Sequence, residues 1–343
     1  MWPTPDTAEL KIGLVGLGSI GDVHARALHD VPGTVLMAFS GGDADAAANC
    51  GWPEAAHVGH GDVAQRDDVD VVVLCSPTST HAQLAMAAAR AGKHVVVEKP
   101  IALSVADAVA IAELQRSEGV LIAGVSQRRL EPEYARVKSL LDDGHLGEIR
   151  MAATEVHWVR DKAYYDVAAW RRSQAEGGGA LMNQGFHNVD LLRWLCGPAE
   201  SVTAHYATLA NDMDAEDTIV STVRFESGAL ATISISTATP PGRPATLSLL
   251  TSSGAIRLGQ GAVEVWDVPD VPAPQAGAAV SGAKDPLAIA TVGHVTWWRD
   301  FVECLREGRA YDGDAVDAEL TIRLLCGIYE AADQQRTIHL EDL

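Results

Sequence analysis

The sequence predicts a two-domain protein, in which an α/β dinucleotide-binding domain with a doubly wound parallel sheet precedes an α+β domain. The chain has 343 residues, more than a single domain usually contains. A glycine-rich turn follows an apolar segment near the start, and strand and helix patterns then alternate to residue 125. Alternating β segments joined by short turns occupy much of the remainder. We therefore expect domains at 1–128 and 129–343.

The first domain has the elements of successive βαβ units. We expect strands at 10–15, 34–40, 69–75, 94–97 and 120–125, and helices at 20–29, 81–91 and 104–119. The segment 69–75 is almost wholly apolar, as in a strand that is buried on both faces of a parallel sheet. Ser104 and Asp107 form a capping box at the third helix, and Gly119 ends it. A ligand of such a fold binds at the carboxyl ends of the strands.

The second domain is predicted to contain a large, mostly antiparallel open sheet. We expect strands at 149–158, 202–208, 218–225, 229–237, 245–251 and 255–258, and helices at 132–142, 295–306 and 315–332. Glu226-Ser-Gly228 is a hairpin turn signal between two of these strands. The segment Val268–Pro286 is rich in Pro, Gly and Ala, which predicts a surface loop.

The glycine-rich turn carries the motif Gly16-x-Gly18-x-x-Gly21. Gly16 permits a tight turn, Gly18 lets the backbone approach a pyrophosphate, and Gly21 lets the helix pack closely on the strand. Ser19 precedes the helix that Ile20 begins, and the helix's free N–H groups and positive dipole end favour an anion, so both residues are expected cofactor contacts. Because the motif follows a strand and opens a helix, it predicts a dinucleotide site. The alternative is a glycine-rich turn without a ligand.

Composition and charge exclude several classes of partner. The net charge of −20 argues against nucleic acid or an anionic membrane surface. No apolar stretch approaches the ~18 residues of a membrane span, and the N-terminus lacks the pattern of a signal peptide. The five scattered cysteines contain no CxxC pair, which favours reduced thiols over disulfides or a zinc site. We therefore expect a cytoplasmic enzyme without a bound metal.

Two further motifs resemble a known enzyme family. Glu98-Lys99-Pro100 follows a buried strand, and residues 177–190 read GGGALMNQGFHNVD. Together they resemble the Gfo/Idh/MocA oxidoreductases, the relatives of glucose–fructose oxidoreductase and inositol dehydrogenase, and the resemblance runs nearly end to end. It implies an NAD(P)-dependent enzyme that transfers a hydride to or from a CH–OH carbon of a small-molecule sugar, cyclitol or simple glycoside. It also implies a homodimer or homotetramer formed through the second domain's sheet.

Oxidation of a carbinol needs a base beside the hydroxyl group. Lys99 ends a strand at the predicted crevice, and His187 matches the family's catalytic histidine, so which of them is the base stays open. If 181–194 is helical, Asn183, His187 and Asp190 share one face. Asn183 departs from the aspartate that is commonest in the family, and an amide orients an imidazole without stabilising its charge. We expect Asp190 to be structural.

Residues near these motifs are predicted to contact the substrate. They are Lys99, Gln127, His157, Tyr165, Trp170, Arg171, Asn183 and His187. A planar guanidinium such as that of Arg171 suits vicinal hydroxyls or a carboxylate. The first alternative is a UDP-sugar as substrate, whose diphosphate would need basic residues. Those available are Arg128, Arg129, Arg160, Arg171 and Arg172. The second is a non-catalytic regulator that binds the cofactor, and the presence of both Lys99 and His187 argues against it.

Further cofactor contacts are expected at the ends of the other strands. They are Ser40, Ser76, Pro77, Thr78, His81, Glu98 and Lys99. Thr78 is equally well interpreted as the N-cap of the next helix. Ser40 stands where an acid favours NAD and a small residue beside an arginine favours NADP. Ser40 is small enough for the 2′-phosphate of NADP, but residues 34–65 contain no Lys or Arg, and Asp43 and Asp45 would repel a phosphate. The two clues conflict, so NAD and NADP both stay open, and we lean to NAD.

Overall fold

The computed structural model describes residues 9–275 and 291–343, which form two compact units. The first comprises the described residues up to Gln127 together with residues 291–322, and the second comprises the remainder. The chain passes from the first unit to the second after Gln127, one residue before the boundary expected from the sequence. The sequence interpretation assigned residues 291–322 to the second domain, whereas the structure groups them with the first. The reason is packing, because helix α7 (Thr291–Glu307) lies against α1 (Ser19–His29).

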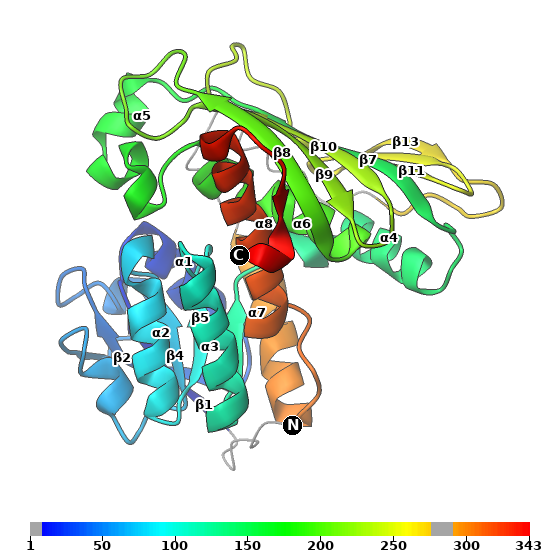
Figure 1. Cartoon of the computed structure of the whole chain (residues 1–343). Coiled ribbons are helices and arrows are strands. Elements are labelled where there is room, and N and C mark those ends of the chain that lie inside the picture. The colour runs from blue at the N-terminus through cyan, green and yellow to red at the C-terminus, as the bar shows by residue number, and fades with distance from the viewer. Residues whose placement is uncertain (1–8, 276–290) are drawn as a thin grey trace. The chain divides into compact units, whose positions relative to one another are not determined.

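The first unit contains a parallel sheet of six strands in the order β3-β2-β1-β4-β5-β6 (Figure 1). The strands are β1 (Leu10–Val15), β2 (Thr34–Ser40), β3 (Ala56–His57), β4 (Val71–Leu74), β5 (His94–Val97) and β6 (Ile122–Gly124). Helices α2 (His81–Arg90) and α3 (Val105–Glu118) pack side by side. The strand order reverses between β1 and β4, which places a ligand crevice at the carboxyl ends of these strands. The predicted doubly wound fold is confirmed.

Local sequence explains these elements. Every residue of β4 and β5 is buried, as their apolar runs predict. Ser104 is the N-cap of α3 as expected, because its hydroxyl oxygen accepts the Asp107 N–H at 3.1 Å, while the Asp107 carboxylate accepts the Ser104 hydroxyl at 2.8 Å. Gly119 ends the helix in the left-handed region, with φ of +66°.

The second unit is built on an eight-stranded sheet in the order β13-β12-β11-β7-β10-β9-β8-β14. The strands are β7 (Ile149–His157), β8 (Ala199–Ala207), β9 (Thr218–Phe225), β10 (Leu230–Ser236), β11 (Thr246–Thr251), β12 (Ala255–Gly259), β13 (Ala262–Asp267) and β14 (Ile338–His339). All neighbours are antiparallel except β7 and β10, so the predicted mostly antiparallel sheet is confirmed. The helices are α4 (Pro132–Asp142), α5 (Lys162–Asp166), α6 (Phe186–Cys196) and α8 (Ala315–Gln334), of which α8 begins in the first unit.

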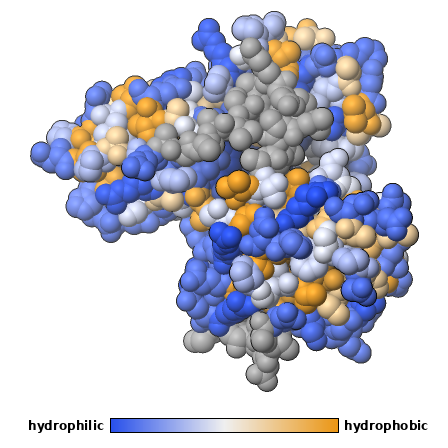
Figure 2. Space-filling view, turned by 180° about the vertical axis from the view of Figure 1, so that it is seen from behind, coloured by the Kyte–Doolittle hydropathy of each residue, from blue (hydrophilic) through white to orange (hydrophobic). Residues whose placement is uncertain are grey.

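The two faces of this sheet differ in what they contact. α6 packs on β7 and β11, and the side chains on that face are buried. On the other face Leu230 pairs with Met151, which in turn pairs with Leu250, and each of these side chains is nearly half exposed. Figure 2 shows a view of the chain in which hydrophilic residues predominate and hydrophobic residues form scattered groups. The open face of the sheet is therefore free of any covering helix among the described residues.

Two expectations meet the limits of the described chain. Residues 268–275 of the predicted loop contain no helix or strand, and the rest of that loop lies outside the described residues. Among the described residues, no helix is both long and apolar enough to cross a membrane.

Candidate functional site

The turn between β1 and α1 has the shape that a pyrophosphate requires. Gly16 has φ of +96°, and a Cβ on it would lie 2.7 Å from the backbone of Cys75 and Ser76. A Cβ on Gly21 would lie 2.3 Å from the Gly16 carbonyl oxygen, whereas a Cβ on Gly18 would meet nothing within 4 Å. No side chain caps α1, so the N–H groups of its first turn remain available to an anion. The turn therefore fits the dinucleotide predicted from the sequence.

The residues that follow in this turn differ in how they are presented. Ser19 is exposed and Ile20 is partly exposed. Ser40 is fully buried, and its carbonyl oxygen accepts the N–H groups of Gly16 and Leu17 at 2.9 and 2.8 Å. Its hydroxyl is buried without a hydrogen-bond partner. Ser40 thus fixes the turn through its backbone, and its side chain does not face solvent as the expected ribose contact would require.

The loop after β4 is held by its own hydroxyl groups. The Ser76 and Thr80 hydroxyls lie 2.7 Å apart, and the Thr80 hydroxyl donates to the Pro77 carbonyl oxygen at 2.7 Å. Thr78 begins a 3-10 turn (Thr78–Thr80) in which Pro77 occupies the N-cap position. The interpretation of Thr78 as the N-cap of α2 is therefore wrong, because the intervening turn puts Thr80 there.

His81 was predicted to contact the cofactor, but the structure gives it a different role. It is 2 % exposed, and its two ring nitrogens lie 2.8 Å from the Pro100 carbonyl oxygen and 2.9 Å from that of Ser76. His81 therefore ties the loop after β4 to the segment after β5. Its side chain has no nitrogen left for a cofactor contact.

Lys99 and Glu98 follow β5, and their side chains differ in burial. Lys99 is partly buried, and burial lowers the pKa of its ammonium group while the charge of Glu98 opposes that effect. Glu98 is buried, and its carboxylate accepts the Lys99 backbone N–H at 2.9 Å and the His24 Nε2–H at 3.0 Å. Both carboxylate oxygens of Glu98 are thus engaged within the protein, and a contact of this residue with the cofactor stays a prediction.

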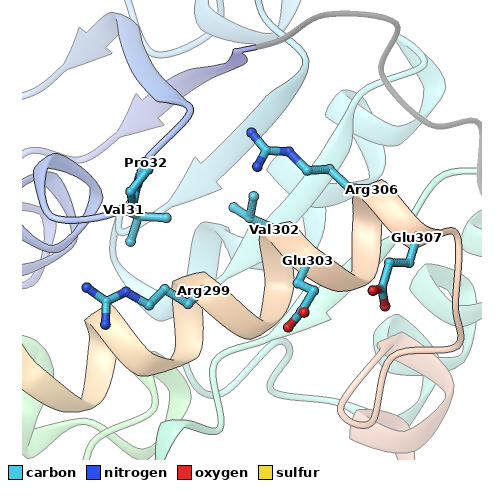
Figure 3. A pocket seen from close by; sticks show the side chains of 7 residues that line it. All are labelled: Val31, Pro32, Arg299, Val302, Glu303, Arg306 and Glu307. Carbon is cyan, nitrogen blue, oxygen red and sulfur yellow. The ribbon is translucent and has the colours of Figure 1, made fainter.

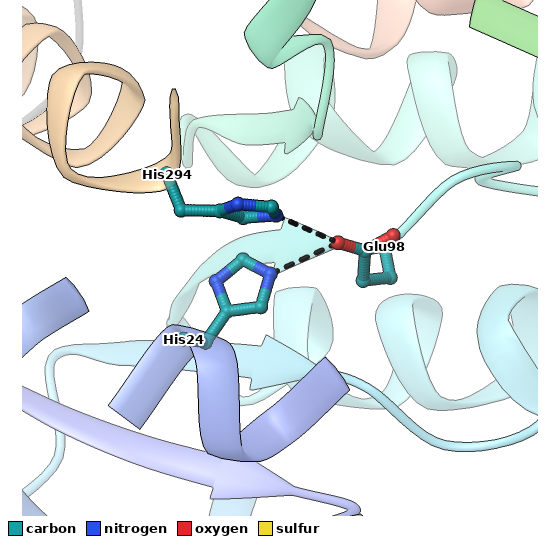
Figure 4. A group of neighbouring side chains, drawn as sticks. All are labelled: His24, Glu98 and His294. Carbon is teal, nitrogen blue, oxygen red and sulfur yellow. Dashed lines mark hydrogen bonds and ion pairs between the residues drawn. The ribbon is translucent and has the colours of Figure 1, made fainter. Parts of the chain in front are cut away.

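Glu98 belongs to a buried cluster with His24 of α1 and His294 of α7 (Figure 4). One ligand atom from each residue lies within 4.8 Å of the others, a spacing that a metal ion bridges in some proteins. The indole N–H of Trp298, however, donates to His24 Nδ1 at 3.0 Å. An indole N–H only donates, so Nδ1 is an acceptor and the ring proton is on Nε2. That proton occupies the lone pair a metal would need, so we assign the cluster as a hydrogen-bonded chain.

In the second unit, the predicted helix at 181–194 begins differently from expectation. A π-helix (Ala180–Gly185) precedes α6, which starts at Phe186. The Glu216 carboxylate accepts the Leu181 N–H at 2.6 Å, and a Cβ on Gly179 would lie 2.5 Å from that carboxylate. The glycine run thus makes room for a buried carboxylate at the first turn. Because Asn183 lies in the wider π turn and His187 in α6, the two do not have the relative direction that one continuous α-helix would give them. Both side chains are partly exposed.

Asn183 is held by a tyrosine that the sequence interpretation did not select. The Tyr164 hydroxyl accepts the side-chain N–H of Asn183 at 3.2 Å and that of Gln184 at 2.6 Å. The predicted Tyr165 is instead 3 % exposed, and its hydroxyl lies 2.9 Å from the Thr237 hydroxyl. The assignment of Tyr165 to the substrate is therefore wrong, and Tyr164 is the tyrosine beside Asn183.

The N-cap of α5 explains why Tyr164, and not Tyr165, lies beside Asn183. Asp161 is the N-cap of α5, and its side chain accepts the Tyr164 N–H at 3.0 Å. This cap fixes which face of the short helix is buried, and Tyr165 falls on that face. An Asp three residues before one of two adjacent tyrosines was the available signal.

Two arginines pack against the Tyr164 ring. The Arg171 guanidinium carbon lies 4.2 Å from the ring centroid, and that of Arg160 lies 5.3 Å from it. Arg171 donates to the Tyr164 carbonyl oxygen at 2.7 Å, while its Nε is buried without a hydrogen-bond partner. Burial lowers the pKa of Arg160, and the positive charge of Arg171 lowers it further. Trp170 is partly exposed, and its ring centroid lies 5.8 Å from the Arg171 guanidinium carbon, so its contact with a substrate stays a prediction.

Two other arginines are committed to the protein interior. Arg129 forms a buried ion pair with Asp190 through contacts of 2.8 and 2.5 Å. Arg128 donates to Glu131 at 3.0 Å and to Asn188 at 2.9 Å. The suggestion that Arg128 and Arg129 bind a diphosphate is therefore wrong, whereas the structural role expected of Asp190 is confirmed.

Two predicted substrate residues remain, His157 and Gln127. His157 at the end of β7 has its Nε2 2.8 Å from the Ser234 hydroxyl of the neighbouring strand β10. Gln127 ends the described first segment of the first unit, and its side-chain oxygen is buried without a hydrogen-bond partner.

A surface hollow of about 430 Å³ lies elsewhere in the first unit (Figure 3). It is lined by Val31, Pro32, Arg299, Val302, Glu303, Arg306 and Glu307. Arg299 and Arg306 donate to backbone carbonyl oxygens of the segment after α1. None of the residues predicted for catalysis or cofactor binding lines this hollow, so we do not assign the reaction to it.

Known proteins resemble both halves of the chain. The model of the oxidoreductase family's NAD-binding Rossmann fold matches residues 10–125, and that of the GFO/IDH/MocA C-terminal domain matches residues 134–257. Inositol 2-dehydrogenase of Rhizobium meliloti is 32% identical over 72% of this chain and 74% of its own length. Myo-inositol 2-dehydrogenase of Thermotoga maritima is 29% identical over 72% and 74%.

Solved structures agree over nearly the whole chain. The WlbA dehydrogenase of Bordetella pertussis, in complex with NADH and UDP-GlcNAcA, matches with a TM-score of 0.86 and 30% identity over 98% of this chain and 99% of its own. The family predicted from the sequence is thereby confirmed. This chain belongs to the GFO/IDH/MocA oxidoreductases, and its first domain is the NAD-binding Rossmann fold of that family.

Proposed function

We propose that this oxidoreductase is a dehydrogenase that transfers a hydride between NAD and a CH–OH carbon of a sugar or cyclitol, with Lys99 as the general base. The observation that carries the proposal is the position of Lys99. It follows β5 at the carboxyl edge of the parallel sheet, the edge that also carries the glycine turn after β1. Burial lowers its pKa and so favours the neutral amine that accepts a proton.

The proposal assigns residues both to cofactor binding for hydride transfer and to removal of the hydroxyl proton. The bound nicotinamide supplies the hydride acceptor, and the turn from Gly16 to Gly21 holds the pyrophosphate. Lys99 Nζ takes the proton of the substrate hydroxyl as the neutral amine and becomes an ammonium. His187 and Asn183 hold and orient substrate hydroxyls, and Tyr164 fixes the amide of Asn183. This assignment gives the proton to Lys99 and leaves His187 with binding.

NAD is the favoured cofactor in this proposal. The family of the first domain is described as NAD-binding, and WlbA was crystallised with NADH. Residues 34–65 contain no Lys or Arg that would pair with a 2′-phosphate, while Asp43 and Asp45 follow β2. The 2′-phosphate of NADP would therefore lie near negative charge.

The test is nicotinamide reduction at 340 nm with purified protein, using inositols, free sugars, uronic acids and UDP-sugars against NAD and NADP separately. We expect turnover of a cyclitol or sugar with NAD, and a kcat/KM with NADP that is lower by at least tenfold. Measurable NADH binding without turnover of any panel member would contradict the proposed function. It would favour the non-catalytic regulator instead.

A nucleotide-linked sugar is the second candidate substrate, and one cluster favours it. Arg160 and Arg171 flank the Tyr164 ring near Asn183, so the second unit offers two positive charges beside a predicted substrate residue. The Bordetella WlbA complex contains such a substrate, UDP-GlcNAcA. In the same panel, a UDP-sugar that is turned over at least tenfold better than free sugars would select this candidate. An Arg171→Gln variant would then lose the preference.

We also propose that the protein forms a homo-oligomer through the open face of the eight-stranded sheet. Met151, Leu230 and Leu250 lie side by side there, and each is nearly half exposed. Leu230→Glu places a charge in their midst and is expected to lower the molar mass measured by light scattering. Val292→Glu on α7 is the matched control, because Val292 is 74 % exposed and lies outside this sheet. An unchanged mass for Leu230→Glu would contradict the assignment.

A reducing, cytoplasmic location completes the proposal. All five cysteines are free, and four of them are buried. Thiols in such positions persist where disulfide formation is disfavoured.

A further inference from the structure

Behind Lys99 lies a buried hydrogen-bonded chain that the proposed reaction does not use directly. It runs from Trp298 of α7 through His24 of α1 to Glu98, whose second carboxylate oxygen accepts the backbone N–H of Lys99. Each of the first three side chains is buried, and the two N–H···N and N–H···O contacts on His24 are 3.0 Å long. Side chains of two helices, His24 of α1 and His294 of α7, point at the carboxylate of Glu98, which follows β5 (Figure 4).

The direction of the chain is fixed by its first donor. Because the Trp298 indole can only donate, His24 must accept at Nδ1 and therefore donate from Nε2 to Glu98. Burial lowers the pKa of His24, which keeps the imidazole neutral. A neutral histidine with a fixed tautomer stabilises a carboxylate anion without cancelling its charge.

The charge on Glu98 is maintained by this arrangement. Burial alone would raise the pKa of Glu98, but the interactions with His24 and His294 bring it well below its usual range. A buried carboxylate without such donors would take up a proton instead. His24 and His294 thus keep the buried carboxylate of Glu98, the residue next to Lys99, negatively charged.

We propose that Trp298, His24 and Glu98 are positioning residues that hold a fixed negative charge behind Lys99 and thereby set the pH at which Lys99 accepts a proton. This inference rests on the proposed role of Lys99 as the base. Without Glu98, burial would make Lys99 a weaker proton acceptor over the pH range in which the enzyme works. With Glu98, the lysine stays basic enough to remove a hydroxyl proton and release it in a later step.

Three further side chains face Glu98 or Lys99. His294 Nε2 lies 3.7 Å from the Glu98 carboxylate, and neither ring nitrogen of His294 has a hydrogen-bond partner. Burial and the negative charge of Glu98 both raise the pKa of the Cys75 thiol, so the thiol stays neutral. His81 faces both residues, and burial lowers its pKa so that it too stays neutral. The charge of Glu98 raises the pKa of Lys99 and so opposes the effect of burial.

The direct test is the pKa of Lys99 in the cofactor-free protein, measured by NMR with labelled lysine. The sequence has six lysines, and a Lys99→Arg sample identifies the signal. Glu98→Gln keeps the size of the side chain and removes its charge. It is expected to lower the pKa of Lys99 by about 1 or more, as the loss of a nearby opposite charge does. Trp298→Phe releases the tautomer of His24 and is expected to lower it by a smaller amount.

The chain offers matched controls for both changes. Glu118→Gln removes an equal charge from the exposed end of α3, and Trp297→Phe changes the adjacent tryptophan, whose indole N–H has no hydrogen-bond partner. Neither is expected to move the Lys99 signal. The acid limb of the pH–rate profile should move to lower pH in Glu98→Gln by the same amount as the NMR pKa.

The outcomes separate the two proposals. An unchanged pKa of Lys99 in both Glu98→Gln and Trp298→Phe overturns the positioning role, even if Lys99→Ala abolishes turnover. Normal turnover in Lys99→Ala overturns the catalytic assignment, whatever the NMR shows. If Glu98→Gln does not fold, Trp298→Phe against Trp297→Phe still decides.

Discussion

Removal of the Tyr164 hydroxyl tests how the structure holds the amide beside His187. In Tyr164→Phe, Asn183 and Gln184 each lose the acceptor of one side-chain hydrogen bond, at 3.2 and 2.6 Å. A hydrogen bond contributes about 0.5–1.5 kcal/mol, so the two together contribute about 1–3 kcal/mol. If that energy holds Asn183 in its productive position, kcat/KM should fall by between about 5-fold and 150-fold.

Tyr165→Phe is the matched control for this experiment. It removes one buried hydrogen bond, to Thr237, and is expected to cost about 1 kcal/mol of stability with little change in kcat/KM. Steady-state kinetics at 340 nm and thermal unfolding of both variants give the comparison. A Tyr164→Phe enzyme with wild-type kcat/KM, or a Tyr165→Phe enzyme with the larger kinetic loss, would refute the assignment of Tyr164 to the site.

Two further predictions concern the supports of α6. Burial raises the pKa of Glu216 to about 7, so the folded chain keeps this proton to higher pH than the unfolded chain, and stability falls as pH rises from about 4.5 to 7. Glu216→Gln should therefore gain up to roughly 3 kcal/mol relative to wild type at pH 8 and nothing at pH 4, which urea unfolding at the two pH values measures. Asp190→Asn leaves Arg129 buried without its carboxylate and should cost about 3–5 kcal/mol. A shift in urea midpoint that corresponds to less than about 1 kcal/mol would contradict that role of the ion pair.

Much of the fold could be predicted because burial leaves a strong pattern in the sequence. The apolar run at β4 and the capping box at Ser104 place their elements to within a few residues. β13 was missed because its residues are mostly exposed or partly exposed on both faces, so no alternation of burial was imposed on them. The two-residue strands β3 and β14 are too short to carry a period.

The site was harder to predict because partners are set by tertiary packing. The glycine motif and Lys99 follow from local order, since a strand and a turn place them at one sheet edge. Arg129, in contrast, is separated from Asp190 by 61 residues, and nothing local shows that the two form an ion pair. The π-helix before α6 was missed for a related reason, because its first turn donates the Leu181 N–H to Glu216, a residue from another part of the chain.

Replacement of Lys99 by alanine tests the central claim most directly. The glycine turn remains intact, so NADH affinity measured by fluorescence should change little, while kcat for the substrate found in the panel should fall by about 100-fold to 10,000-fold, as the loss of a general base predicts. A Lys99→Ala enzyme that binds NADH and keeps kcat within about threefold of wild type would contradict the account, because proton removal would then belong to another group.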